Sequence, residues 1–200
     1  MATRPLRALR ALVAAVVAAA TTACAPIWVP IEVTTPRPFP MPTFELAMDL
    51  PVGWMSSYYG PAIGHFFFTR HGAELQQFWV RRWPKTQVVK GTNRSITSGM
   101  TVQDVAMLSL DSRRLDEGVG ALEVVSNRPV ELGRQACYRL DYRYRDAIGL
   151  PRRAVEYGCP VGAWMYRFEY MAPEQHYFDR YLPDFEASVA TVVFETAGAS

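Results

Sequence analysis

Apolar and polar residues alternate most regularly between residues 136 and 171. Every second position carries a ring or an aliphatic group in two runs, one made of Tyr138, Leu140, Tyr142 and Tyr144 and one of Trp164, Tyr166, Phe168 and Tyr170. Mostly charged residues fill the positions between them. A period of two is typical of antiparallel strands with one buried and one solvated face. The pattern therefore predicts a meander whose aromatic face is covered by the rest of the chain.

Similar patterns predict the other elements of an α+β domain. Strands are expected at 43–50, 63–69, 74–83, 122–126 and 129–132, with a turn at Pro51–Trp54 that carries an indole into the core. Thr101 and Asp104 resemble a capping box ahead of a helical stripe that ends before Gly118. A last helix is expected from Ala172-Pro173-Glu174, kinked or split at Pro183, with a short edge strand at residues 192–194.

The first 42 residues predict secretion and attachment to a membrane. Three arginines precede the apolar run 11–20, which is too short to span a bilayer and is typical of a signal peptide, residues 1–23. Residues 21–24 resemble the bacterial lipobox, which implies that Cys24 is lipidated; ordinary cleavage after Ala25 is the alternative. Several acyl chains would anchor the protein firmly.

The position after Cys24 favours one of the two bacterial membranes. Ala25 lacks the aspartate that, in lipoproteins of the enteric type, retains the protein in the inner membrane. We therefore expect a lipid-anchored, periplasm-facing protein of the cell envelope, with the outer membrane favoured. Residues 24–42, rich in proline, are expected to form a stiff tether, and residues 43–200 a single domain.

Cys137 and Cys159 remain as an even pair in an oxidising compartment, so a disulfide is expected; two buried thiols are the alternative. Pairing them directly would set Leu140 against Glu156, which mismatches one apolar and one solvated face. The register that matches Leu140 with Val155 would separate the sulfurs. A bulge near Gly158 is one way to reconcile the two.

Charge and motifs exclude several classes of function. The formal net charge of +2 falls to about −1 without Arg4, Arg7 and Arg10 of the signal peptide, which argues against nucleic-acid binding. The sequence contains no nucleophile elbow, zinc-protease motif, Cys-x-x-Cys pair or phosphate loop. We therefore expect no enzymatic activity, no cofactor and no metal site. The histidines, His65, His71 and His176, are interpreted as structural.

Two sets of polar residues are candidates for function. Asp141 and Glu156 are expected on adjacent strands and could form an acid–base pair, although cross-strand ion pairs on a wet face explain them better. A basic and aromatic set could bind an anionic glycan, a lipid headgroup or an acidic partner. The alternative for that set is a solvated edge strand and loop. Its members are Trp79, Arg81, Arg82, Trp83, Lys85, Lys90 and Arg94.

The order of motifs resembles the PsbP-like superfamily, named for an extrinsic protein of photosystem II. The resemblance is carried by Leu50-Pro51-Val52-Gly53-Trp54, the aromatic meander, and Ala172-Pro173 followed by Tyr177-Phe178. It covers about Thr43 to Phe194 and implies an antiparallel sheet sandwiched by helices, with no shared catalytic residues. Members mostly act as accessory or assembly proteins.

These observations predict a non-enzymatic, lipid-anchored envelope protein that binds an unknown envelope protein or anionic component. A carrier of an apolar ligand, held in a cavity between the sheet and the helices, is the alternative. A hydrolase that uses Asp141 and Glu156 is a third hypothesis.

Overall fold

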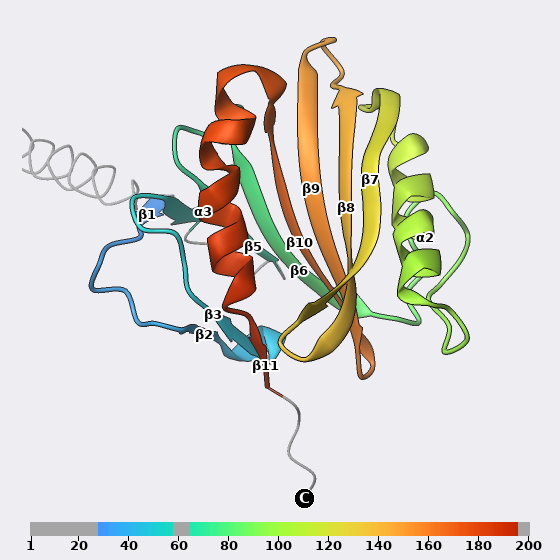
Figure 1. Ribbon diagram of the computed structural model, residues 1–200, viewed down its shortest axis with the longest axis horizontal. Coiled ribbons are helices and arrows are strands. Elements are labelled where there is room, and N and C mark those ends of the chain that lie inside the picture. The colour runs from blue at the N-terminus through green and yellow to red at the C-terminus, as the bar shows by residue number, and fades with distance from the viewer. Residues whose placement is uncertain (1–27, 58–64, 196–200) are drawn as a thin grey trace, which may run out of the picture.

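The computed structural model describes residues 28–57 and 65–195. An eight-stranded antiparallel sheet forms the centre, with strands in the order β1-β4-β5-β6-β10-β9-β8-β7 (Figure 1). A smaller sheet has the order β11-β3-β2. The strands of the large sheet are β1 (Trp28–Pro30), β4 (Met55–Ser57), β5 (His65–Thr69), β6 (Gln77–Pro84), β10 (Trp164–Pro173), β9 (Pro151–Val161), β8 (Gln135–Arg145) and β7 (Gly120–Leu132). Those of the small sheet are β2 (Phe39–Met41), β3 (Leu46–Met48) and β11 (Val193–Phe194).

Two helices cover opposite faces of the large sheet. Helix α2 (Val102–Arg114) contacts β7, β8 and β9, and it begins at the predicted capping box of Thr101 and Asp104. Helix α3 (Asp179–Ala190) lies across the sheet in Figure 1 and packs on the other face. The α+β class with helices on both sides of an antiparallel sheet is therefore confirmed. Helix α3 starts later than predicted, because β10 runs on to Pro173 and a turn, η3 (Glu174–Phe178), follows it.

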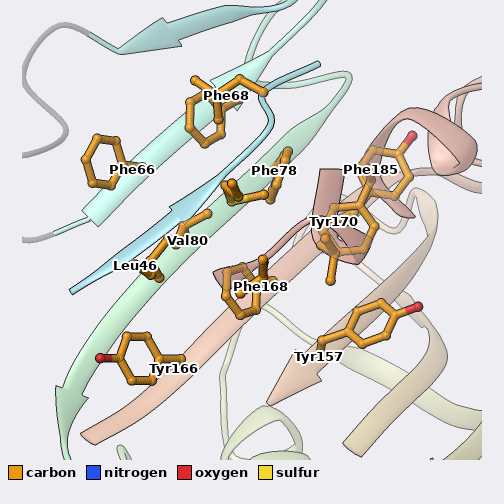
Figure 2. Close-up of a cluster of buried hydrophobic side chains, with 14 of the residues drawn as sticks. Leu46, Phe66, Phe68, Phe78, Val80, Tyr157, Tyr166, Phe168, Tyr170 and Phe185 are labelled. Atoms are coloured by element: carbon orange, nitrogen blue, oxygen red, sulfur yellow. The ribbon is translucent and has the colours of Figure 1, made fainter. Parts of the chain in front are cut away.

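The two aromatic runs lie on opposite faces of the sheet, which corrects the expected single aromatic face. Tyr138, Leu140 and Tyr142 of β8 pack under α2. The rings of β10 face α3, and Figure 2 shows Tyr166, Phe168 and Tyr170 beside residues of β5 and β6. Since both faces are covered, the expected wet face does not exist over the centre of the sheet. Charged residues between the rings are buried as well, among them Glu156 and Glu169.

This arrangement also settles the register around the cysteines. Leu140 stands opposite Glu156, the pairing that first seems mismatched, and the ladder from Tyr138 to Arg145 continues without a bulge. The pairing is tolerated because Glu156 is buried on the α2 face together with Leu140. Cys137 and Cys159 point to the α3 face and are joined by a disulfide.

The predicted tether is wrong for residues 28–42, which pack against the domain. Strand β1 pairs with β4, and the Ile31 amide donates a hydrogen bond of 2.8 Å to the Trp54 carbonyl. Ile31 and Met41 are buried in the main core. The segment is rich in proline, which favours an extended chain. Its spaced apolar residues nevertheless gain free energy on burial, and this favours docking on the domain over a free polyproline segment. The predicted signal peptide and Cys24 lie outside the described residues.

Trp54 confirms the turn that was expected to carry an indole into the core. The side chain is fully buried, and its Nε1 donates a hydrogen bond of 2.9 Å to Asp184 Oδ2 of α3. Phe78, Tyr170 and Tyr181 surround the ring in edge-to-face or inclined contacts. This turn therefore fixes α3 over the aromatic face.

Candidate functional site

Strand β6 presents two chemically different faces. Phe78 and Val80 are fully buried on the α3 face, as Figure 2 shows, because a strand alternates its side chains. Trp79, Arg81 and Trp83 lie on the opposite face, where Trp79 stands across from Glu169 and Arg81 across from Arg167. The alternation in the sequence 77–84 thus places a basic and aromatic row beside the charged positions of β10.

Three arginines surround the buried carboxylate of Glu169. Arg113, from the last turn of α2, contacts Glu169 Oε1, and Arg167 Nε lies 4.0 Å from Glu169 Oε2. Tyr142 donates a hydrogen bond of 3.0 Å to the same carboxylate. Arg81 completes the group from β6 through its electrostatic interaction with Glu169. We call these three residues the arginine cluster: Arg81, Arg113 and Arg167. A second buried carboxylate, Glu156 of β9, stands opposite Glu169, so two negative charges are set against three positive ones.

Aromatic rings hold two of these guanidinium groups. The Arg81 Cζ atom lies 4.3 Å from the centroid of the Trp79 ring, and the Arg167 Cζ atom lies 5.1 Å from that of Trp83. Both distances are within the range of cation–π attraction. Phe67 stacks on the other side of the Trp79 ring with centroids 4.1 Å apart, which fixes that ring in turn. The cluster is therefore held from behind by rings and a carboxylate.

The arginine cluster lines a pocket of about 310 Å³. Trp83 and the loop that follows β6 contribute to its wall, together with Lys90 and Asp116 near the mouth. Lys90 Nζ lies 3.5 Å from Asp116 Oδ2, and the lysine side chain is largely exposed. The pocket is the size of a small-ligand site, and its lining combines arginines and a lysine with apolar residues such as Trp83, Val88 and Val89.

Burial and charge shift the pKa values in this site. Burial alone would raise the pKa of Glu169, but Arg113, Arg167 and Arg81, with the Tyr142 hydrogen bond, lower it to about 2. Burial is the main reason that the pKa of Arg81 falls to about 10; Glu169 opposes this fall, while Arg167 and Arg113 add to it. Glu169 therefore stays ionised at neutral pH, and so does the cluster around it.

The structure gathers only part of the predicted basic and aromatic set. Trp79, Arg81 and Trp83 share one face, and Lys90 joins Arg81 and Trp83 around the pocket. Arg82 also borders the pocket, but its guanidinium group lies on the opposite face, where its Nη1 is 3.1 Å from Glu45 Oε1 and its Cζ is 4.0 Å from the Trp164 ring centroid. Lys85 and Arg94 belong to the loop, where the Lys85 carbonyl accepts a hydrogen bond from Ile96 and the Arg94 carbonyl one from Val89.

Sequence reasoning missed Arg113, Arg167 and Glu169. They come from two elements that are far from β6 in the sequence, and each looks like an ordinary solvated charge on a helix or strand. One signal was available, since Arg167 and Glu169 share a face of a strand whose other face is entirely aromatic. It could be interpreted only with the knowledge that α2 closes over that face.

A second buried carboxylate, Glu156, lies under α2 without a cation in direct contact among the described residues. Ser109 of α2 donates a hydrogen bond of 2.6 Å to Glu156 Oε1, and the Tyr138 hydroxyl contacts the same oxygen. The Tyr138 ring crosses Gly158 so closely that a Cβ atom there would stand 2.1 Å from the ring. The missing side chain of Gly158 thus allows the tyrosine to reach the carboxylate.

The hypothesis of an acid–base pair between Asp141 and Glu156 is not supported by their positions. Asp141 stands opposite Val155, one residue out of phase with Glu156, so the two carboxylates lie on opposite faces of the sheet. Asp141 accepts two hydrogen bonds of 2.9 Å from Arg153. The alternative interpretation, a cross-strand ion pair, is confirmed for Asp141, although the pair is buried and not on a wet face.

The histidines are not gathered into one site. His65 lies on β5 beside Trp79, with ring centroids 4.9 Å apart, and His71 lies beside Tyr181 of α3. Within residues 28–57 and 65–195, no group of three or more His, Cys, Asp or Glu side chains could hold a metal ion.

An apolar cavity lies elsewhere than expected. It measures about 340 Å³ and is enclosed by the segment 29–39 and strands β4 and β5, with Phe66 and Phe68 in its wall. Beneath α2, beside Ser109 and Tyr138, the free space is only about 20 Å³. Side chains therefore fill the space under this part of α2, and the apolar cavity lies between the domain's N-terminal segment and strands β4 and β5.

The fold defines the class of this protein as α+β, with an antiparallel sheet between helices. No family model matches the chain, and no curated protein is similar to it in sequence. Solved structures show that the fold is PsbP-like. Cyanobacterial PsbP from Synechocystis sp. PCC 6803 is 14% identical, with a TM-score of 0.53 over 86% of this chain and 95% of that one.

Two further structures are similar at a comparable level. A protein of Bacteroides thetaiotaomicron VPI-5482 is 14% identical, with a TM-score of 0.50, and the match covers 80% of this chain but only 48% of that one. LpqN of Mycobacterium tuberculosis, involved in cell envelope biogenesis, is 12% identical, with a TM-score of 0.45 over 83% of this chain and 89% of that one. This chain thus spans about half the length of the Bacteroides protein. Identities this low concern the fold alone.

No helix in the described part of the chain is both long and apolar enough to cross a bilayer.

Proposed function

We propose that this chain is a non-enzymatic binding module of the bacterial cell envelope, anchored by lipid on Cys24, which holds an anionic group of an envelope component in the arginine-cluster pocket. The observation that carries the proposal is that three guanidinium groups line that pocket, whereas the carboxylate with which two of them pair, Glu169, is buried and does not line it. The separation of Asp141 from Glu156 supports a binding role over hydrolysis. The lipobox supports the anchor.

The pocket suits capture of an anion for a physical reason. Guanidinium groups present several N–H donors in a fixed plane and remain charged at any physiological pH. Rings and Glu169 already hold them in place, so little conformational freedom is lost when a ligand binds. The exposed pair of Lys90 and Asp116 at the mouth is worth little and opens easily.

Binding of the full-length chain to acidic envelope material tests the recognition part. The panel contains an acidic polysaccharide, a phosphate-bearing glycan and soluble acidic lipid headgroups. At least one should bind, more weakly as salt rises, because salt screens the attraction. Arg81→Gln should weaken that binding, whereas Arg143→Gln removes the same charge at an ion pair with Glu174, away from the pocket, and should not. Absence of binding to all of them, or equal loss in both variants, would contradict the proposal.

Mass analysis of the protein from a membrane fraction tests the anchor. A diacylated and N-acylated Cys24 is expected, and Cys24→Ala should release the chain from membranes. An unmodified N-terminus after Ala25 would show ordinary cleavage instead.

A second candidate function is the carriage of an apolar ligand in the 340 Å³ cavity. Its wall is mostly aliphatic and aromatic, including Ile31, Phe39 and Phe66, and its volume is within the range of small-molecule sites. Native mass spectrometry of gently extracted protein should show a bound apolar molecule. Ser56→Trp should displace it, because Ser56 lines the cavity and a tryptophan there would fill it. A protein that carries no such molecule would exclude this function.

A further inference from the structure

The charge of the arginine cluster favours an anion. Arg81, Arg113 and Arg167 bring three positive charges to the wall of the pocket, and Glu169 cancels one of them. Glu156 stands opposite Glu169 on β9 and brings a second buried negative charge, whereas Lys90 is matched by Asp116. By this count of formal charges the pocket keeps an excess of positive charge, and the side chains that line it are the cations and not the two buried carboxylates.

Free hydrogen-bond donors point to the same conclusion. In the part of the chain that the structure describes, the buried Nε atoms of Arg113 and Arg167 have no hydrogen-bond partner, and Glu169 Oε2, which lies 4.0 Å from Arg167 Nε, has none either. A buried donor without a partner costs free energy unless a ligand satisfies it. Both side chains line the pocket, so an acceptor placed there can reach their guanidinium groups.

The directions of approach favour a tetrahedral group over a planar one. Arg113 enters from α2, Arg167 from β10 and Arg81 from β6, so the three donors converge from three elements. A carboxylate offers two oxygens in one plane, whereas a phosphomonoester offers three strong acceptor oxygens and close to two negative charges. A volume of about 310 Å³ leaves room for part of the group that carries the phosphate.

We propose that the pocket binds the phosphomonoester group of an envelope component, with Arg81, Arg113 and Arg167 each donating to the phosphate oxygens and Glu169 holding the arginines from behind. This inference rests on the proposed function and narrows its ligand to one chemical class. A lipid and a sugar can both carry such a group, and the recognised chemistry is the same in both.

Thermal unfolding of the full-length chain with inorganic phosphate tests the proposal, with chloride and acetate at matched ionic strength as references. Phosphate should raise the Tm as its concentration increases, because a ligand that binds only the folded state stabilises it. Glycerol 3-phosphate and glucose 1-phosphate then separate a lipid-type from a sugar-type source. A phosphodiester, which carries one charge, should act more weakly than either.

Two variants connect the effect with the cluster. Arg81→Gln should weaken phosphate binding about tenfold or more, as expected for the loss of a hydrogen bond between charged groups. Arg143→Gln is the matched control, since Arg143 does not line the pocket and its guanidinium group pairs with Glu174. Glu169→Gln should have a lower Tm without phosphate, because three cations then lack their counterion. When phosphate is added, the Tm of this variant should rise by more than the Tm of the unmodified chain.

The outcomes separate this inference from the proposed function. Phosphate that stabilises no more than chloride overturns the inference, and so does equal loss of phosphate binding in Arg81→Gln and Arg143→Gln. If a carboxylated polysaccharide still binds in a manner that depends on Arg81, only the ligand class is wrong and the proposed function stands. If neither kind of anion binds, both are wrong.

Discussion

The aromatic centre of the α3 face and the middle of the α2 face are buried in chemically different ways, although the α3 face also buries Asp141 of β8. On the α3 face, Phe185 packs its ring 4.8 Å from that of Phe78 and 5.6 Å from that of Tyr170, measured between centroids. On the α2 face, the buried groups include Glu156 and Glu169, each held by tyrosine hydroxyls. Equal burial therefore does not mean equal chemistry.

This difference shows which part of the structure requires side chains of the right volume and which part requires specific charged partners. Apolar burial is non-directional and tolerates any acceptable packing. Buried carboxylates require specific partners, and replacing such networks by apolar residues often leaves a protein as stable or more stable. A charged cluster under α2 is therefore weakly explained by stability alone, which agrees with the proposed role in binding.

The largest effect is expected from a cavity in the α3 face. Phe185→Ala removes a ring at the centre of the aromatic contacts and should lower the free energy of unfolding by about 3–5 kcal/mol. Chemical denaturation monitored by tryptophan fluorescence measures this loss. Phe185→Leu retains much of the volume and should cost clearly less; equal costs would show that the ring does not fill a close-packed site.

On the α2 face, the contribution to the free energy of unfolding should instead depend on pH. The folded-state pKa of Glu169, about 2, is below the ordinary value of 4.5. Its ionised form therefore contributes stability that is present above about pH 5 and is lost as pH falls toward 2. The groups that face it are Arg113 of α2, Arg167 of β10, Arg81 of β6 and Tyr142 of β8.

Urea unfolding at several pH values between 7 and 2 measures this contribution. The Glu169→Gln variant should have a lower free energy of unfolding at pH 7 than the unmodified chain. Between pH 5 and pH 2, that free energy should fall less in the variant than in the unmodified chain. Identical slopes in this range would contradict the assigned ion pairing.

A moderate effect is expected at Gly158, where the two strands and Tyr138 meet. Gly158→Ala would place a methyl group inside the tyrosine ring, so Tyr138 must move and release Glu156. Overpacking of this kind typically costs about 1–3 kcal/mol. Gly99→Ala is the control, since nothing lies within 4 Å of a Cβ atom there. If the Tm of Gly158→Ala falls no further than that of Gly99→Ala, the Tyr138 ring can move aside without a loss of stability.

The smallest effect concerns the start of α2. Thr101 accepts a hydrogen bond of 3.2 Å from the Asp104 amide, and Asp104 accepts one of 2.8 Å from the Thr101 amide. Thr101→Ala should cost about 1 kcal/mol, as is usual for the loss of an N-cap. Thr101→Ser keeps the hydroxyl group and should remain close to the unmodified chain in thermal unfolding. A full loss in the serine variant would point to the methyl group and not to the cap.

Local features were predictable because their signals lie within a few residues. The capping box of α2, the β5–β6 hairpin and the buried turn at Trp54 all follow from short patterns. The short strand β11 was expected for the same reason. Alternation also showed that Trp79 and Arg81 share a face of β6.

Errors arose where a pattern has two physical solutions. Alternating rings in β8 and β10 indicate that each strand buries one side, but not which side of the sheet that is. Only the register of Leu140 against Glu156 puts the two rows on opposite faces. Residues 28–42 posed a similar problem, since proline favours an extended chain that can either stand free or pack on a surface.

By itself, the sequence determined the class of the fold, the hairpin pairing of consecutive strands such as β5 and β6, the two cysteines available for a bond and the basic row on β6. The tertiary structure alone decided that α2 closes over charged side chains and that Arg113, Arg167 and Arg81 meet around Glu169. The physical reason is the separation along the chain over which each effect acts. Strand and helix propensities act between near neighbours in the chain, whereas the energy of a buried charge depends on groups 56 and 88 positions away, as Arg113 and Arg81 are from Glu169.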